Sequence, residues 1–85
     1  MDTEADEPDF ELLAPISHIE VIARGTGVHL RHFLNRTYGR GNWRKLKGQA
    51  VIKMKVNEFT GLAEIHWFEA HGIGRRKMKR KRWIT

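Results

Sequence analysis

Two stretches near the middle of the chain alternate between apolar and polar residues, as half-buried β-strands do. In QAVIKMKV (49–56), apolar side chains at 50, 52, 54 and 56 face one way, and the lysines at 53 and 55 face the other. In LAEIHWFE (62–69), the expected core residues are Ala63, Ile65 and Trp67, and the residues of the opposite face are Glu64, His66 and Phe68. NEFTG (57–61) joins the two stretches and suits a hairpin connection.

A third extended stretch, RRKMKRKRWI (75–84), follows the turn AHGIG (70–74). It offers only Met78, Trp83 and Ile84 to a core. Because residues 78 and 83 differ in parity, we expect a β-bulge between them or a frayed end. Seven of the eight residues from 75 to 82 are basic, so both faces of this strand carry positive charge. We therefore expect the strand at an edge of the sheet.

The segment Val28–Tyr38 has the apolar spacing of an amphipathic α-helix. Its stripe, at i, i+3, i+4, i+7 and i+8, consists of Leu30, Phe33, Leu34, Thr37 and Tyr38. Thr26 is the expected cap, and Gly39 suits the left-handed residue after the helix. The polar side presents His29, His32 and Arg36, with Arg31 and Asn35 at its flank.

ISHIEVIAR (16–24) fits two structures. Alternation of Ile19, Val21 and Ala23 indicates a strand, whereas Ser17 followed by Glu20 has the spacing of a helix capping box. The β-branched content and the early Gly25 favour the strand.

These elements predict an α+β domain, in which one main helix packs on a small antiparallel sheet of three to four strands. We assign residues 15–85 to this single basic domain. Residues 1–14 form an acidic tail, which we expect to be disordered because it is highly charged and poor in apolar groups.

Charge narrows the choice of partner. The net charge is +6, but residues 1–11 hold six of the ten acids and none of the 16 bases. Residues 12–85 therefore carry a net charge of +12, which is typical of proteins that bind a polyanion. Nucleic acid is the leading partner, and an acidic protein is the alternative. The chain has no cysteine and no apolar run of membrane-spanning length, so we expect a cytoplasmic protein without a membrane partner.

We expect the basic residues to bind RNA, or another single-stranded nucleic acid, by neutralising phosphates. Planar side chains among them, such as Trp43, suit stacking on unpaired bases, although small domains also use tryptophan as core filler. The expected binding residues are Arg31, Arg36, Arg40, Trp43, Arg44, Arg75, Arg76, Lys77, Lys79, Arg80, Lys81 and Arg82. A charged edge that deters aggregation, and a nuclear address in KRKR, are alternative interpretations of the last strand.

Whether the protein is an enzyme stays open at this point. His66 and Glu64 point the same way on one strand, and His71 lies in the following turn. Such groups can move protons during RNA cleavage without a metal, so a small ribonuclease is the second hypothesis. Pairing of the glutamates with cations on neighbouring strands is the structural alternative. We expect no metal site and no cofactor, because there is no cysteine and no HExxH motif.

The layout of a basic chain, with a helix before an antiparallel sheet whose late strands carry His, Arg and Lys, resembles small ribonuclease toxins of the RelE and barnase–colicin type. The resemblance rests on layout over residues 16–84, without a matching motif. It implies metal-independent RNA cleavage on the sheet and an acidic antitoxin partner. The acidic N-terminus of this chain, and its lack of two long N-terminal helices, depart from the RelE-like pattern.

Overall fold

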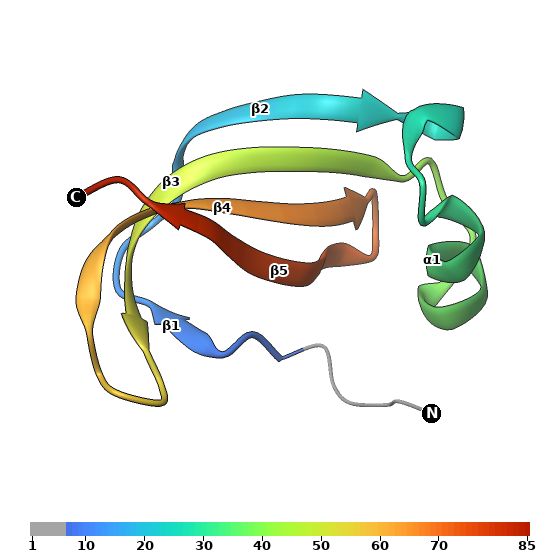
Figure 1. Cartoon of the computed structure of the whole chain (residues 1–85). Coiled ribbons are helices and arrows are strands. Elements are labelled where there is room, and N and C mark those ends of the chain that lie inside the picture. The colour runs from blue at the N-terminus through green and yellow to red at the C-terminus, as the bar shows by residue number, and fades with distance from the viewer. Residues whose placement is uncertain (1–6) are drawn as a thin grey trace.

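Five antiparallel strands and one short helix make up residues 7–85, the part of the chain that this computed structural model describes (Figure 1). The elements in chain order are β1 (Phe10–Leu12), β2 (Ser17–Arg24), a 3-10 turn (Gly25–Gly27), α1 (Arg31–Tyr38), β3 (Arg44–Met54), β4 (Thr60–Ala70) and β5 (Gly74–Trp83). The α+β class, the main helix and the strand at 16–24 are confirmed. The sheet has more strands than we expected.

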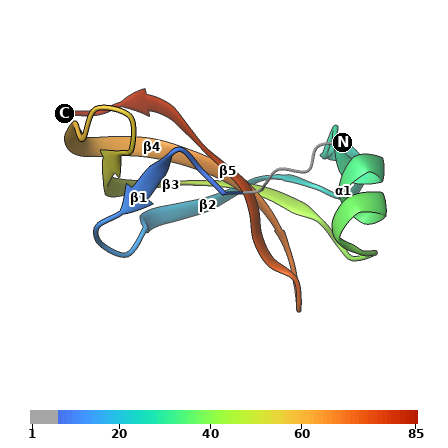
Figure 2. The same cartoon turned by 90° about the horizontal axis from the view of Figure 1, so that it is seen from below.

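The sheet has the order β1–β3–β4–β5, and β2 pairs with the same edge of β3 as β1 does. β1 pairs with the end of β3, from Ile52 to Met54, and β2 pairs with its beginning, from Arg44 to Gln49. The sheet is strongly twisted and curls into a half-barrel, with α1 at one end (Figure 2). β5 pairs with β4 alone among the described strands, so its predicted edge position is confirmed.

The inner face of the sheet carries the main core. Its buried residues come from alternate positions of β3 and β4, as the period-two pattern predicted. They are Leu46, Ala50, Ile52, Met54, Ala63, Ile65 and Trp67, and Met78 and Trp83 pack against them from β5. We call the opposite surface the outer face.

β3 contributes a glycine, Gly48, to this inner face, beside the residues that lead into β2. A Cβ atom at position 48 would lie 2.5 Å from Cγ2 of Ile16, and a real Cβ does not come so close to a neighbour. Gly48 thus leaves room for the Ile16 side chain to pack closely against β3.

The first residues of β1 belong to the core and not to a detached tail. Phe10 is 2% exposed and packs in the inner cluster. Residues 10–12, which we assigned to the disordered tail, instead form a strand. One aromatic residue within an acidic segment was too small a signal to show this. Residues 1–6 of the predicted tail lie outside the described residues.

α1 begins one turn later than the hydrophobic stripe indicated. The backbone N–H of Val28 donates to Gly25 O at 3.0 Å, which closes the 3-10 turn and takes Thr26 away from the capping position. Leu30 is the N-cap residue instead, and Gly39, with φ of 122°, ends the helix as expected. Leu34 then packs with Val28, Trp43 and Ala70 in a second cluster at the end of the sheet.

Candidate nucleic-acid interface

Two bulges distribute the seven bases of β5 between the two faces of the sheet. The β4–β5 register shifts between the Glu64 and Ile65 pairs and again between the His66 and Phe68 pairs, and Lys77 has a positive φ of 55°. Residues paired across antiparallel strands point to the same face. Arg76, Lys79 and Arg82 therefore lie on the outer face, opposite Phe68, His66 and Glu64, respectively. Arg75 and Arg80 lie on the inner face, opposite Glu69 and Ile65.

The bulges also account for the parity of the two apolar residues. Met78 and Trp83 both pack against the inner core, although residues five positions apart point to opposite faces of a regular strand. The predicted re-phasing of this strand is confirmed.

The outer face contains a hollow of about 200 Å³, which we call the basic hollow. Its lining comes from α1's N-cap and three strands, and consists of Leu30, Lys45, His66, Phe68, Lys77, Lys79 and Lys81. Four of these seven residues are lysines, and none is a carboxylate. Leu30 and Phe68 add apolar surface.

Carboxylates pair with some lysines of the sheet but, within residues 7–85, not with Lys45, Lys79 or Lys81 of the basic hollow. On β3 and just beyond it, Lys47 pairs with Glu20 at 3.7 Å, Lys53 with Glu11 at 4.0 Å and Lys55 with Glu7 at 2.9 Å. Within residues 7–85, no carboxylate lies within 4 Å of the amine of Lys45, Lys79 or Lys81. Lys45 instead places its amine 5.7 Å from the centre of the Phe68 ring. Lys45, Lys79 and Lys81 therefore give uncompensated charge to the hollow that Phe68 also lines.

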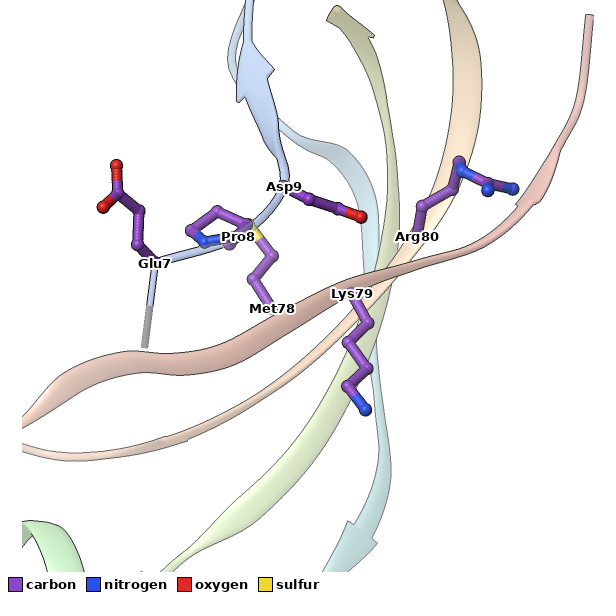
Figure 3. Close-up of a pocket in the computed structure, with 6 residues that line it drawn as sticks. All are labelled: Glu7, Pro8, Asp9, Met78, Lys79 and Arg80. Carbon is purple, nitrogen blue, oxygen red and sulfur yellow. The ribbon is translucent and has the colours of Figure 1, made fainter. Parts of the chain in front are cut away.

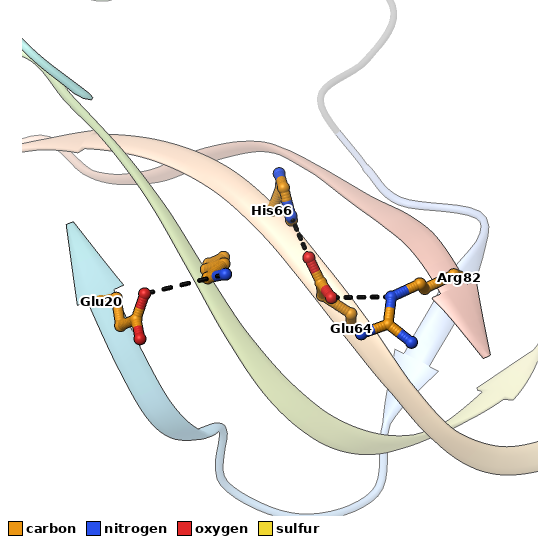
Figure 4. Close-up of polar contacts among 5 residues, drawn as sticks. Glu20, Glu64, His66 and Arg82 are labelled. Atoms are coloured by element: carbon orange, nitrogen blue, oxygen red, sulfur yellow. Dashed lines mark hydrogen bonds and ion pairs between the residues drawn. The ribbon is translucent and has the colours of Figure 1, made fainter. Parts of the chain in front are cut away.

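Glu64 fixes the positions of His66 and Arg82 on the outer face, because both of its carboxylate oxygens accept hydrogen bonds (Figure 4). Oε2 lies 2.6 Å from His66 Nε2, and Oε1 accepts from Arg82 Nε at 3.0 Å. The hydrogen bond to His66 and the nearby charge of Arg82 hold the pKa of the Glu64 carboxyl below its ordinary value, against a smaller opposing effect of burial. Glu64 thus joins His66 and Arg82, two side chains of the outer face, by hydrogen bonds.

This pairing does not resemble a general base poised for RNA cleavage. One ring nitrogen of His66 faces Glu64, and the other, Nδ1, is enclosed and has no hydrogen-bond partner among the described residues. A base for a 2′-hydroxyl needs a nitrogen that the substrate can reach. His71 is exposed in the turn after β4, about 16 Å along the chain from His66 at 3.3 Å per residue. The structure does not bring His71 together with His66 and Glu64, and ribonuclease activity stays a prediction.

Replacing Glu64 with glutamine will change how stability depends on pH. A carboxyl whose pKa is lowered in the folded state stabilises that state above its unfolded pKa of about 4.3, and the effect is lost as pH falls through the lowered value. We expect the urea midpoint of the wild type to fall between about pH 5 and pH 3 more steeply than that of Glu64→Gln. If the midpoints of the two proteins change with pH in parallel, the pKa of Glu64 is not lowered in the folded state.

Several arginines that we expected to bind nucleic acid are occupied or lie on the inner face. Arg44 forms an ion pair with Glu69, which also accepts a hydrogen bond from Trp67 Nε1 at 2.9 Å. The guanidinium groups of Arg75 and Arg80 lie over the rings of Trp67 and Trp83, at 5.2 and 5.0 Å from their centres. These three arginines therefore stabilise the inner face.

Trp43 is too deeply buried to stack on a base, contrary to our expectation. It is 1% exposed, and its indole N–H donates to Gly39 O at 3.2 Å. The ring packs in the second core cluster and has no free face for a base.

A second hollow, of about 320 Å³, separates the segment before β1 from β5 (Figure 3). It is lined by Glu7, Pro8, Asp9, Met78, Lys79 and Arg80. The side chain of Met78 rises toward Pro8, whereas Lys79 points away from this segment. Lys79 thus extends from β5 toward the basic side of the sheet.

The remaining cations of the predicted site lie on and beside α1. Arg31, Arg36 and Arg40 line a hollow of about 430 Å³ together with His32 and Asn35, and we call these three arginines the arginine cluster.

Residues 7–85 contain no group of three or more His, Asp or Glu side chains that could hold a metal ion.

Sequence reasoning missed three residues of the basic hollow, namely Leu30, Lys45 and Phe68. Alternation correctly placed Phe68 on the face away from the inner core, and there it packs against the second cluster. The pairing of Lys45 with Phe68 depends on the register between β3 and β4, whereas alternation alone assigns each residue to a face and not to a partner.

Comparisons of the chain with protein-family models, with curated proteins and with solved structures found no match. The resemblance to ribonuclease toxins therefore stays a prediction.

Within residues 7–85, no helix has both the length and the apolar character needed to cross a membrane.

Proposed function

We propose that this protein binds single-stranded nucleic acid on the outer face of its sheet, with the basic hollow at the centre of the site. The observation that carries the proposal is that Lys45, Lys79 and Lys81 line one hollow with Phe68, without a carboxylate in the lining. Lysines at such a surface neutralise phosphates and release the counterions that surround them. Phe68 offers a ring on which a base can stack once the amine of Lys45 moves to a phosphate.

The aromatic ring favours a single strand over a duplex. Phe68 is partly buried in a small hollow, where a base must leave its own stack to reach the ring. Bases of a duplex are paired and stacked, whereas those of a single strand are available. RNA and single-stranded DNA share this chemistry, and direct comparison of the two tests the preference for RNA.

Fluorescence anisotropy with a labelled dodecanucleotide tests this function. We expect RNA or single-stranded DNA to bind more tightly than a duplex of the same length. With three lysine–phosphate contacts, from Lys45, Lys79 and Lys81, the logarithm of the association constant should fall with the logarithm of salt concentration with a slope of about −2.1.

Two outcomes would contradict the proposal. Affinity for the single strand that does not change with salt would show that lysine–phosphate contacts do not drive binding. Tighter binding of a glutamate peptide than of an oligonucleotide with the same number of charges would instead identify an acidic protein as the partner.

A further inference from the structure

The arginine cluster on α1 lies in a part of the chain that has no acidic residue of its own. No Asp or Glu occurs between Val21 and Asn57, a range that holds nine of the 16 bases. Within the described residues, no carboxylate lines the hollow around the cluster. Arg36 and Arg40 are exposed, and none of the carboxylates at 7–85 forms an ion pair with either of them.

A hydrogen bond fixes the loop that carries one of these arginines. The side-chain oxygen of Asn35 accepts from the backbone N–H of Gly41 at 3.3 Å, so the loop after α1 folds back on the helix. This contact brings Arg40 to the hollow that Arg31 and Arg36 line. Guanidinium groups can form two parallel hydrogen bonds with a phosphate, so the cluster suits phosphate binding.

The cluster adjoins the basic hollow through α1 itself. Leu30 lines the basic hollow, and the next residue, Arg31, lines the cluster. β5 contacts the same helix, because the amine of Lys77 lies 5.5 Å from the centre of the Phe33 ring and the guanidinium of Arg76 lies 4.9 Å from that of Tyr38. The two cationic surfaces are therefore adjacent at the start of α1, where Leu30 and Arg31 follow each other.

We propose that one nucleic-acid strand runs from the basic hollow over the start of α1 to the arginine cluster. This inference rests on the proposed function and extends it. The ligand is then a chain of several nucleotides, on the order of the 4–16 that a small β-domain covers, and not a single nucleotide or a short end. The basic hollow holds one part of the strand, and the arginines bind phosphates further along it.

A length series separates the two parts of the path. We expect affinity to rise from a trinucleotide to a dodecanucleotide in the wild type. Arg36→Ala combined with Arg40→Ala should remove most of that rise and leave trinucleotide binding within about twofold. Loss of two phosphate contacts should make the salt slope for the dodecanucleotide shallower by about 1.4.

Lys53→Ala combined with Lys55→Ala is the matched control, because it also removes two positive charges from the chain. Both lysines pair with carboxylates, and neither lines the basic hollow or the arginine cluster. The control should keep both the gain with length and the salt slope. Circular dichroism of each variant checks that the fold is intact.

The outcomes distinguish the path from the site on which it rests. Equal binding of short and long strands, unchanged by Arg36→Ala with Arg40→Ala, would overturn the path and leave the basic hollow as the site. An equal loss for all lengths in that variant would also overturn it, because the arginines would then contact the shortest ligand. Absence of binding at every length would refute the proposed function together with the path.

Discussion

Replacing Lys79 and Lys81 with glutamate will weaken binding of a single-stranded dodecanucleotide on the order of 100-fold. Both residues are exposed, line the basic hollow and have no carboxylate partner within residues 7–85. The double replacement changes the charge of the hollow by −4 and sets two carboxylates against the phosphates. Anisotropy titrations of wild type and variant at one fixed salt concentration give the ratio of the two affinities.

Arg24→Glu combined with Lys55→Glu gives the same change in net charge at positions outside both cationic surfaces. This control should lose less than about tenfold in affinity, since only the general attraction of a basic protein is weakened. Equal losses in the two double variants would mean that net charge governs binding, and the basic hollow would not be a site.

Replacing Phe10 with alanine will lower the free energy of unfolding by about 3–5 kcal/mol. The side chain is 2% exposed and packs among the residues of the inner core, with its backbone paired to Met54. A domain of this size has a net stability of only about 5–10 kcal/mol, so the variant will be partly unfolded at moderate temperature. Urea denaturation followed by tryptophan fluorescence measures the change.

Leu12→Ala, on the same short strand, is the control for this experiment. Leu12 is 38% exposed, and its truncation should cost about 1 kcal/mol or less. If Phe10→Ala were no more destabilising than Leu12→Ala, the first strand would not be part of the core, and the segment would behave as the tail that its composition indicates.

Most of the elements follow from local patterns in the sequence. The period-two alternation of β3 and β4 identified Ala63, Ile65 and Trp67 as core, and all three are buried. The mismatch in parity between Met78 and Trp83 predicted the irregularity of β5. These signals are strong because each depends only on which face of one strand must avoid water.

The parts that could not be predicted depend on pairing between distant segments. Phe10 enters the core because β1 pairs with the end of β3, some forty positions away in the chain. Trp43 stands beside cations in the sequence, yet the position of α1 at the end of the sheet buries its ring. The basic hollow forms where three strands and the start of a helix lie side by side. Local composition does not predict which segments lie together in this way.

The structure also changes which cations are the candidates for binding. From the sequence, Arg80 and Arg82 would be natural targets for charge reversal in the last strand. In the fold, Arg80 lies over Trp83 on the inner face and Arg82 pairs with Glu64. Lys79 precedes Arg80 and Lys81 lies between the two arginines, and both lysines line the basic hollow.

Mapping of a bound oligonucleotide by amide chemical shifts tests the central proposal most directly. Titration of the isotope-labelled protein with a single-stranded dodecanucleotide should shift the amides of Lys45, His66, Phe68, Lys79 and Lys81 most strongly, and those of Arg36 and Arg40 as well. Amides of the buried inner face, such as Ile52 and Ile65, should change little. The largest shifts at the inner face or around β1, with the residues of the basic hollow unmoved, would contradict the proposal.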